Sequence, residues 1–302
     1  MATFTTPDNR AAAIAANQAA AIAHRQARQA GLSNDQIDHR VATGAWSRAV
    51  RGVYVVAGSP DTPQQRLWIA HLATAQAGGV VSYLSAAAVF GLAPFPPLPH
   101  VTVPSLASAD SRGARVHRGT IPAQDRTRRG GLLVTSVSRT LADCATVLDR
   151  PSFEQLVDVA FCRKLATEAS TLAAAGRAGA RRRGIALLRD VTRVWGPRIE
   201  PGSPAEMRLL RVAAELGLDD LVPQFEVYDQ NGLFVARLDV ASPSRFCAFE
   251  YDGLEHHGPR AWSRDEPRYG RLKKLGWRVE SVTKTDLLPG EQRIRQIIRR
   301  WT

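Results

Sequence analysis

Long apolar runs and paired cysteines are both scarce in this sequence. No stretch approaches the roughly 18 uncharged apolar residues that a membrane-spanning helix needs. The alanine-rich start also lacks the leucine-rich core of a secretory signal. The three cysteines are far apart and form no CxxC pair, so we predict reduced packing residues rather than a disulfide framework or a zinc site. Together these absences favour a cytoplasmic protein without a membrane partner.

Acidic residues are in short supply over the first two thirds of the chain only. Residues 203–302 contain 16 Lys and Arg against 15 Asp and Glu, which leaves 24 basic and 13 acidic residues for positions 1–202 out of totals of 40 and 28. A basic surplus suits a polyanionic partner, because neutralised phosphates release condensed counterions. DNA is therefore the first expected partner, and charge that serves solubility alone is the alternative.

The amino-terminal segment has the pattern of two helices, a tight turn, a third helix and a strand pair. Residues 22–31 and 32–44 read as the last two helices, with Ser33 and Gln36 as a capping box and Gly44 as a stop. A basic strand pair follows, and helix–turn–helix plus hairpin predicts a winged helix-turn-helix domain. A small helical subdomain with a solvated polar face is the alternative. The expected DNA contacts are Asn34, His39 and Arg40 to base edges, and Arg48 and Arg51 to phosphates.

This segment resembles the amino-terminal region of AbiEi-type antitoxins, the regulatory halves of bacterial toxin–antitoxin pairs. The resemblance implies a winged helix that binds operator DNA and represses its own promoter, with a cognate toxin as protein partner. The stretches that carry it are QAGLS (29–33), HRVATGAW (39–46) and RGVYVVAG (51–58), with weaker support from VSYLSAAAVFGL (81–92) and VTSVSRTLADCA (134–145).

The middle of the chain reads as a small mixed α/β module that presents basic loops. Two alanine-rich helices over 64–92 precede short strands at 101–103, 114–118 and 132–136, and helices return near 138–148, 152–163 and 184–195. His117 is expected to be a half-buried strand residue. Three arginines at 181–183 either hold phosphate or form a solvated loop. A linker rich in proline and glycine at 195–204 predicts a domain boundary near residue 200.

The carboxyl-terminal third predicts an α/β layout in which acidic residues sit on apolar strands. Asp239 lies between Leu238 and Val240, and Glu250 and Asp252 leave the next strand on a common face because side chains alternate with period two. Clustered carboxylates repel one another unless a cation lies between them, and hard oxygen ligands suit Mg²⁺ or Mn²⁺. The sequence therefore predicts a metal site formed by Asp239, Glu250 and Asp252.

Residues 203–288 resemble the PD-(D/E)xK restriction-endonuclease-like fold, in the branch that contains very-short-patch-repair endonucleases and an uncharacterised ExDG family. The resemblance implies that Asp239 and Glu250 bind metal, while Asp252 stands where many nucleases of this fold have lysine. The stretches that carry it are SPAE, RLDVA, FEYDGLEHH, RDEPR and LKKLGWRVESVTKTDL.

Without that lysine, another group must activate the attacking water. His257 is the first candidate for a general base and His256 the second, with surface histidines as the alternative. Arg268 is expected to hold the scissile phosphate or to pair with Asp265 on the same helix face. Flanking backbone contacts are expected from Lys273, Lys274 and Arg278. Glu206 follows Ser203 by three residues, which a capping box explains without chemistry.

The expected fold class is α/β, with α+β character for the chain as a whole. We expect a winged helix-turn-helix over 1–60, a mixed α/β antitoxin-like module over 61–196, and a restriction-endonuclease-like mixed sheet flanked by helices over 203–302. The leading functional hypothesis is a DNA-binding protein with a Mg²⁺-dependent endonuclease domain. The alternative is a non-catalytic antitoxin or transcriptional repressor that uses the nuclease-like unit only for binding.

Overall fold

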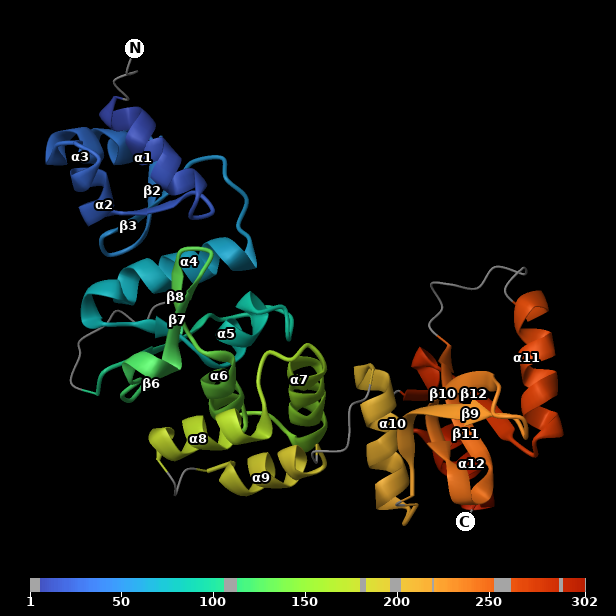
Figure 1. Ribbon diagram of the computed structural model, residues 1–302. Coiled ribbons are helices and arrows are strands. Elements are labelled where there is room, and N and C mark those ends of the chain that lie inside the picture. The colour runs from blue at the N-terminus through green and yellow to red at the C-terminus, as the bar shows by residue number, and fades with distance from the viewer. Residues whose placement is uncertain are drawn as a thin grey trace. The chain divides into compact units, whose positions relative to one another are not determined.

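The computed structural model describes most of the chain and divides it into two compact units. It covers residues 6–105, 113–179, 183–195, 202–218, 220–252, 262–287 and 290–301, without the side chains of Asp252, residues 262–266 and Lys284. Unit 1 consists of residues 1–149 and 169–188, and unit 2 of residues 150–168 and 189–302 (Figure 1). None of the described helices is both long enough and apolar enough to cross a membrane.

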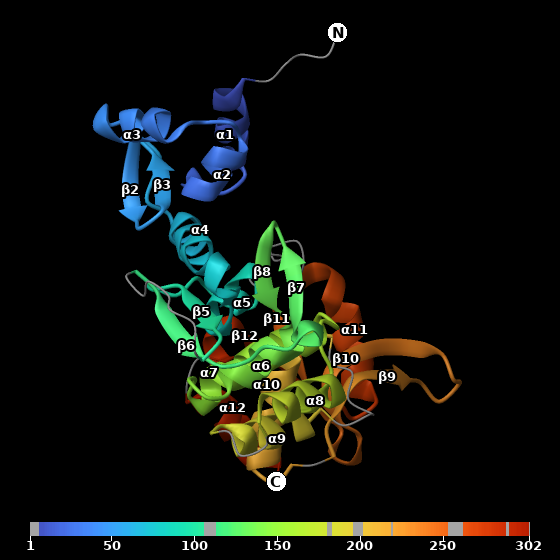
Figure 2. The same ribbon diagram turned by 90° about the vertical axis from the view of Figure 1, so that its left-hand side faces the viewer.

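Unit 1 begins with three helices and a three-stranded antiparallel sheet (Figure 2). The predicted capping box is confirmed, because Ser33 Oγ accepts from the Gln36 N–H at 3.1 Å and Gln36 Oε1 accepts from the Ser33 N–H at 2.8 Å. The predicted helix pair and hairpin are present, and the sheet order is β1-β3-β2. The elements are α1 (Pro7–Ala16), β1 (Ala21–Ala23), α2 (His24–Gln29), α3 (Asn34–Ala42), β2 (Trp46–Val50) and β3 (Val53–Val56).

The rest of unit 1 is built on a mixed five-stranded sheet in the order β6-β5-β4-β8-β7. Trp68 packs into a core shared with Ala21 and Val55 of the first sheet and with Val101 and Val134 of the second, so one apolar cluster joins the two sheets. The elements are α4 (Pro63–Thr74), β4 (Val80–Val81), α5 (Tyr83–Val89), β5 (His100–Val103), β6 (Arg115–Arg118), β7 (Arg126–Arg129), β8 (Leu132–Thr135), α6 (Val137–Cys144) and α8 (Glu168–Ala178), and α9 (Ile185–Arg193) begins here.

Two smaller predictions about unit 1 are confirmed. His117 is half-buried on β6, where its ring stacks on Tyr83 with centroids 3.6 Å apart and its Nε2 lies 3.2 Å from Nδ1 of His100. Cys144 is free and buried, and Cys162 and Cys247 in unit 2 are free as well. Burial raises the pKa of all three thiols, which keeps them protonated and suits packing residues.

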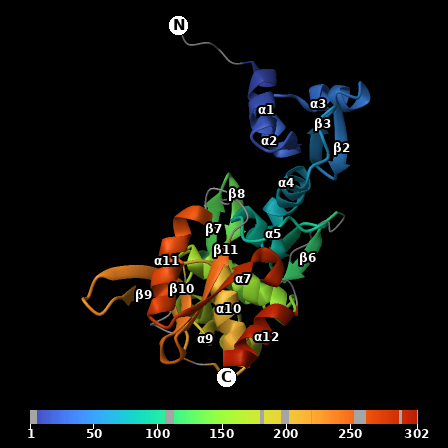
Figure 3. The ribbon, with the colours of Figure 1, turned by 90° about the vertical axis from the view of Figure 1, so that its right-hand side faces the viewer.

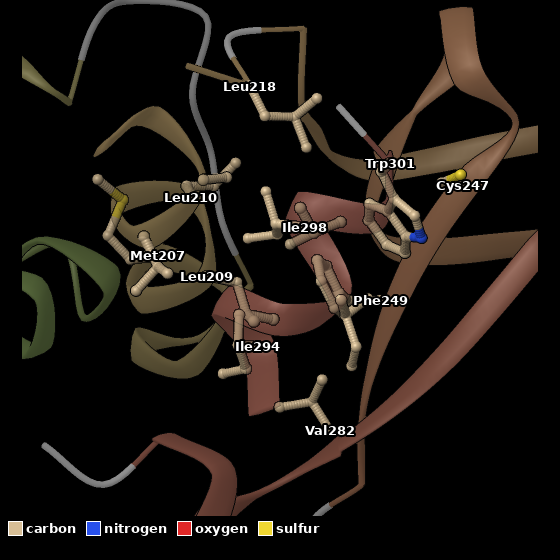
Figure 4. Packing of buried hydrophobic residues seen from close by; sticks show 14 residues of the cluster. Met207, Leu209, Leu210, Leu218, Cys247, Phe249, Val282, Ile294, Ile298 and Trp301 are labelled. Carbon is tan, nitrogen blue, oxygen red and sulfur yellow. The ribbon is translucent and has the colours of Figure 1, made fainter. Parts of the chain in front are cut away.

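Unit 2 is a four-stranded sheet in the order β12-β11-β10-β9 with helices on both faces. Only β11 and β12 run parallel; the other described pairs are antiparallel. α10 and α12 cover the face that carries Phe249 and Val282 (Figure 4). Helix α11 (Figure 3) packs through Leu272 into the second apolar cluster of the sheet. The elements are α7 (Arg150–Cys162), α10 (Pro204–Glu215), β9 (Val222–Tyr228), β10 (Phe234–Ser242), β11 (Cys247–Asp252), α11 (Trp262–Lys274), β12 (Arg278–Thr283) and α12 (Gln292–Trp301).

Helix α7 is held to α10 by buried ion pairs, although the sequence suggested that it belongs to the middle module. Arg211 Nη2 lies 2.7 Å from Asp158 Oδ1, and the two side chains are 4% and 3% exposed. Trp195 Nε1 donates to the same carboxylate at 2.9 Å. Unit 2 therefore reaches back beyond the predicted linker, of which residues 196–201 lie outside the described chain.

The predicted fold class is confirmed. Helices are interleaved with one antiparallel and two mixed sheets, an α+β arrangement. The carboxyl-terminal mixed sheet flanked by helices matches the layout expected for residues 203–302.

Candidate functional site

Two of the predicted carboxylates meet across neighbouring strands of unit 2. Val240 on β10 pairs with Phe249 on β11, so the next position places Asp239 opposite Glu250. Residues opposite one another in an antiparallel pair point to the same face, with Cβ atoms about 5 Å apart. Asp239 also accepts a hydrogen bond at 2.9 Å from the backbone N–H of Tyr251. The predicted convergence of Asp239 and Glu250 is therefore present.

Asp239 lies on a regular part of β10. Residues 236–241 keep one register with β9, and the shift of register lies nearer the start of the strand, between Phe234 and Ala236. Leu238 and Val240 are fully buried, whereas Asp239 between them is only partly buried. Period-two alternation therefore points Asp239 away from the face that carries Leu238 and Val240. Opposite Asp239 on β9, Gln224 has a left-handed backbone with φ of 53°.

Glu250 is held by two side chains from α11. Its carboxylate, 13% exposed, forms an ion pair with Arg268, and the Tyr269 hydroxyl donates to Oε2 at 2.5 Å. Arg268 Nη2 also donates to the backbone carbonyl of Arg237 on β10 at 3.2 Å. Leu272, fully buried one turn later, fixes this face of the helix on the sheet.

Asp239 and Glu250 together carry more negative charge than Arg268 can neutralise. Burial raises the pKa of Glu250, the Tyr269 hydrogen bond and the Arg268 charge oppose this rise, and the nearby Asp239 adds to it. Two carboxylates therefore face one guanidinium among the described side chains. Oxygen donors with uncompensated negative charge suit a hard divalent cation, so Asp239 and Glu250 fit Mg²⁺ or Mn²⁺.

The remaining predicted members of the site are described only in part. Asp252 continues β11 opposite Thr283 of β12, but its side chain lies outside the described part. His256 and His257 lie outside the described residues, as does the side chain of Asp265. Among the side chains that are described, no three of His, Cys, Asp or Glu converge as a cation site.

Glu206 has a structural role that accounts for its burial. Its carboxylate accepts from the Gly202 N–H at 2.8 Å, from Ser203 Oγ at 3.0 Å and from Gln224 Nε2 at 2.8 Å. The Ser203 cap is present, because Ser203 Oγ accepts from the Glu206 N–H at 3.2 Å, but the Glu206 carboxylate accepts from the N–H of Gly202 rather than that of Ser203, so the capping box is only half formed. Gln224 lies opposite Asp239 in the register of β9 and β10, so its side chain connects this cap to the strand beside Asp239.

Lys273 and Lys274 are exposed at the end of α11, more than one turn beyond Arg268. Arg278, by contrast, donates from Nη2 to Cys247 Sγ at 3.0 Å. Tyr269 was missed by the sequence analysis, although its position next to Arg268 on an amphipathic helix was a usable signal.

In unit 1, the predicted base-contacting residues on α3 differ in how they are held. Asn34 and His39 are exposed. Arg40 pairs with Asp8 of α1, donates to the Gln36 carbonyl at 2.5 Å and lies 5.8 Å from the centroid of the Trp46 ring. Arg40 therefore helps to hold α3 against α1 and β2, and a base contact would compete with these interactions.

The predicted phosphate contacts lie on the β2–β3 hairpin. Arg48 is exposed on β2, with its guanidinium carbon 5.9 Å from the centroid of the Tyr54 ring. Arg51 is exposed at the tip, next to Gly52 whose φ is 73°. Neither arginine has an acidic partner among the described residues, which leaves both charges available to an anion.

Comparison with known proteins gives relatives without an assigned function. No family model matches the chain. Two uncharacterised proteins of Mycobacterium tuberculosis, MT2308 of strain CDC 1551 and Rv2248 of strain H37Rv, are each 28% identical over 259 residues, which covers 85% of this chain and 92% of theirs. The crystal structure of the RV2827C protein from the same species has a TM-score of 0.40 at 17% identity and covers 77% of this chain and 92% of its own.

Proposed function

We propose that this protein binds DNA through its amino-terminal unit and cuts DNA phosphodiesters with a Mg²⁺- or Mn²⁺-dependent site in unit 2. The observation that carries the nuclease proposal is the juxtaposition of Asp239 and Glu250 on neighbouring strands, with more negative than positive charge around them. Clustered carboxylates at an apolar strand position are costly for stability and typical of functional sites.

Asp239, Glu250 and Arg268 have roles that their positions support. Asp239 and Glu250 would hold the cation, and Asp252 is the third proposed ligand. The cation would polarise the phosphoryl group and lower the pKa of the attacking water. Arg268 is anchored to Glu250 and β10, so its guanidinium can bind a phosphate oxygen beside the carboxylates. His257 stays the proposed general base, with His256 as the substitute.

DNA binding is supported by the helix pair and hairpin at the start of unit 1. α3 presents Asn34 and His39 to solvent, and the hairpin presents Arg48 and Arg51. This arrangement suits a recognition helix in the major groove and a wing along the backbone. The resemblance to AbiEi-type antitoxins adds a cognate toxin to the proposed partners.

A second candidate is a non-catalytic repressor, and one observation favours it. Arg268 and Tyr269 already satisfy both oxygens of Glu250, which lowers the electrostatic gain from a cation at that residue. In that case the nuclease-like unit would serve as a binding platform only. The two candidates agree on DNA binding and differ on metal.

Cleavage assays with the full chain separate these candidates. Wild type is incubated with duplex, mismatched and single-stranded DNA in Mg²⁺, Mn²⁺ or EDTA, beside Asp239→Ala and the control Glu226→Ala, which removes an exposed acid from the same sheet. We expect metal-dependent nicking by wild type and the control, and none by Asp239→Ala. A wild type that shifts DNA fragments yet nicks none of them favours the repressor.

A binding assay tests the wing separately. Arg48→Ala combined with Arg51→Ala should weaken duplex binding and reduce the slope of log K against log salt by about 2, since each lost phosphate contact accounts for roughly 0.9. An unchanged affinity in this variant would show that the hairpin does not touch DNA.

A further inference from the structure

A second basic hairpin, formed by β7 and β8, lies outside every motif considered so far. Strand β7 has the sequence Arg126-Thr127-Arg128-Arg129, and all four residues are exposed. Gly130 and Gly131 connect it to β8 with φ values of 54° and 85°, a tight two-residue turn. The β7–β8 hairpin is a short element (Figure 2), and three of its exposed residues are arginines.

These arginines have no acidic partner in the part of the chain that the structure describes. Arg126 Nε donates to the Ile121 carbonyl at 2.6 Å, and Arg128 Nη1 lies 3.4 Å from the Gly131 carbonyl. Such contacts orient a guanidinium without neutralising it. The charge of Arg128 is also felt at the buried His71, whose pKa is lowered mainly by burial and then by this arginine. The hairpin therefore carries about three uncompensated positive charges at neutral pH.

The hairpin is anchored to the same core as the winged helix. Leu132 of β8 is 4% exposed and packs in the cluster around Trp68, which includes Ala21 and Val55 of the first sheet. A Cβ at Gly131 would lie 3.1 Å from the Trp68 ring, so the turn rests directly on this tryptophan. Both basic hairpins are thereby fixed to one apolar cluster within unit 1.

Charge on β7 also has a simpler explanation. β7 is an edge strand, and charged residues on an edge prevent strand pairing with another molecule. Residues of either sign achieve this, and β6 at the opposite edge carries Arg115 and Arg118. Edge protection therefore predicts that a change of charge sign on β7 has no effect on ligand binding.

We propose that the β7–β8 hairpin is a second phosphate-binding surface, which contacts the backbone of the DNA duplex bound by the β2–β3 hairpin and α3. This inference rests on the proposed DNA-binding function. Unpaired guanidinium groups on a rigid hairpin are suited to phosphate oxygens, and they add affinity without sequence preference. The hairpin then extends the footprint of unit 1 beyond the winged helix.

The test compares the two edges of one sheet. The full chain is titrated into a fluorescent random-sequence duplex of about 30 base pairs at several NaCl concentrations, because the salt slope counts phosphate contacts. Arg128→Gln with Arg129→Gln removes two charges from β7, and Arg115→Gln with Arg118→Gln removes two from β6, roughly 19 Å away across four strand spacings. Circular dichroism and thermal unfolding check that both variants are folded.

We expect the β7 variant to lose about 2 units of salt slope and at least tenfold in affinity at 100 mM salt, while the β6 variant stays within twofold of wild type. Arg128→Lys with Arg129→Lys should keep the slope. Equal losses in both Gln variants, or none in the β7 variant while wild type binds, would overturn the inference and leave DNA binding by the winged helix intact. A wild type that binds no duplex at any salt would overturn the proposed function itself. Tighter binding of a single-stranded RNA that depends on the same arginines would replace the duplex as the ligand.

Discussion

Asp239→Asn should stabilise the metal-free protein, although it replaces a carboxylate of the proposed site by an uncharged amide. The amide keeps the shape of the side chain and an oxygen that can accept from the Tyr251 N–H. It removes a negative charge that adds to the rise in the pKa of Glu250, a rise that burial mainly causes. At a separation of about 5 Å and an effective dielectric constant of about 20, two carboxylates repel by roughly 3 kcal/mol.

That figure is an upper bound, because both groups are partly exposed and Arg268 offsets much of the charge. A discount for solvent screening leaves about 1 kcal/mol of net stabilisation, or a rise of roughly 2–4 °C in the Tm. The opposite effect is expected when metal is present. Ligand that binds only the folded wild type at 100 times its Kd adds about 2.7 kcal/mol, and the variant should gain almost none.

The assay is differential scanning calorimetry of wild type, Asp239→Asn and the control Glu226→Gln, each in EDTA and in Mn²⁺. We expect the stability order of wild type and Asp239→Asn to reverse between the two conditions and the control to follow wild type. A variant that is less stable than wild type in EDTA, or that keeps the metal-dependent shift, would refute the reasoning about this carboxylate pair.

Three further predictions concern stability. Burial lowers the pKa of His71 from 6.5 to about 4, so the unfolded chain takes up the proton first and the free energy of unfolding falls as the pH drops from 6.5 towards 4. In urea titrations, His71→Phe should remove about 2 kcal/mol of this loss between pH 7 and pH 5. An identical pH dependence in both proteins would contradict the assignment. Asp158→Ala leaves the buried Arg211 without its partner and should lower the free energy of unfolding by about 3–5 kcal/mol in chemical denaturation. Adding Arg211→Leu should recover part of this loss. Additive effects in the double-mutant cycle would argue against coupling between the two side chains. Gly184→Ala should destabilise unit 1 by at least ~2 kcal/mol, because φ is 85° and the added Cβ would lie 2.1 Å from the Ala145 carbonyl oxygen. A variant that unfolds at the same urea concentration as wild type would show that this turn adapts.

Most of unit 2 could be predicted from the sequence because its signals are local and agree with one another. Apolar and polar residues alternate along the middle of β10, isoleucines recur on one side of α12, and Ser203 caps the start of α10. The connection between β9 and β10 contains Asn231-Gly232, a dipeptide typical of two-residue hairpin turns, yet it spans Asp229–Leu233. The side chain of Asp229 explains this, since it accepts from the N–H groups of Asn231 and Leu233 at 2.8 and 2.9 Å.

Elements that depend on a distant partner were missed. β1 is three residues long and was included in a helix that the sequence suggested from residue 22, yet Ile22 is fully buried and pairs with Tyr54. β7 has no apolar residue, so no alternation identifies it; pairing with β8 alone makes it a strand. Helix α8 was also absent from the prediction.

The candidate site was likewise predictable where its signals are local in the sequence, and not where they depend on tertiary packing. The strand register that brings Asp239 opposite Glu250 follows from period-two alternation and was predictable. The partners of the arginines were not, because a long side chain can reach several acids: Arg268 pairs with Glu250, and Arg40 with Asp8 from a helix 32 residues earlier. Such choices depend on tertiary packing, which local patterns do not encode.

The path of the chain between the two units constrains how this protein can be divided. Residues 150–168 belong to unit 2, residues 169–188 return to unit 1, and the chain then enters unit 2 again. Expression of residues 203–302 alone would therefore remove α7 from α10 and leave the buried Arg211 without Asp158. A fragment that keeps unit 2 whole must begin at or before Arg150 and carry residues 169–188 as an insert, so the two units are covalently interleaved rather than joined in tandem.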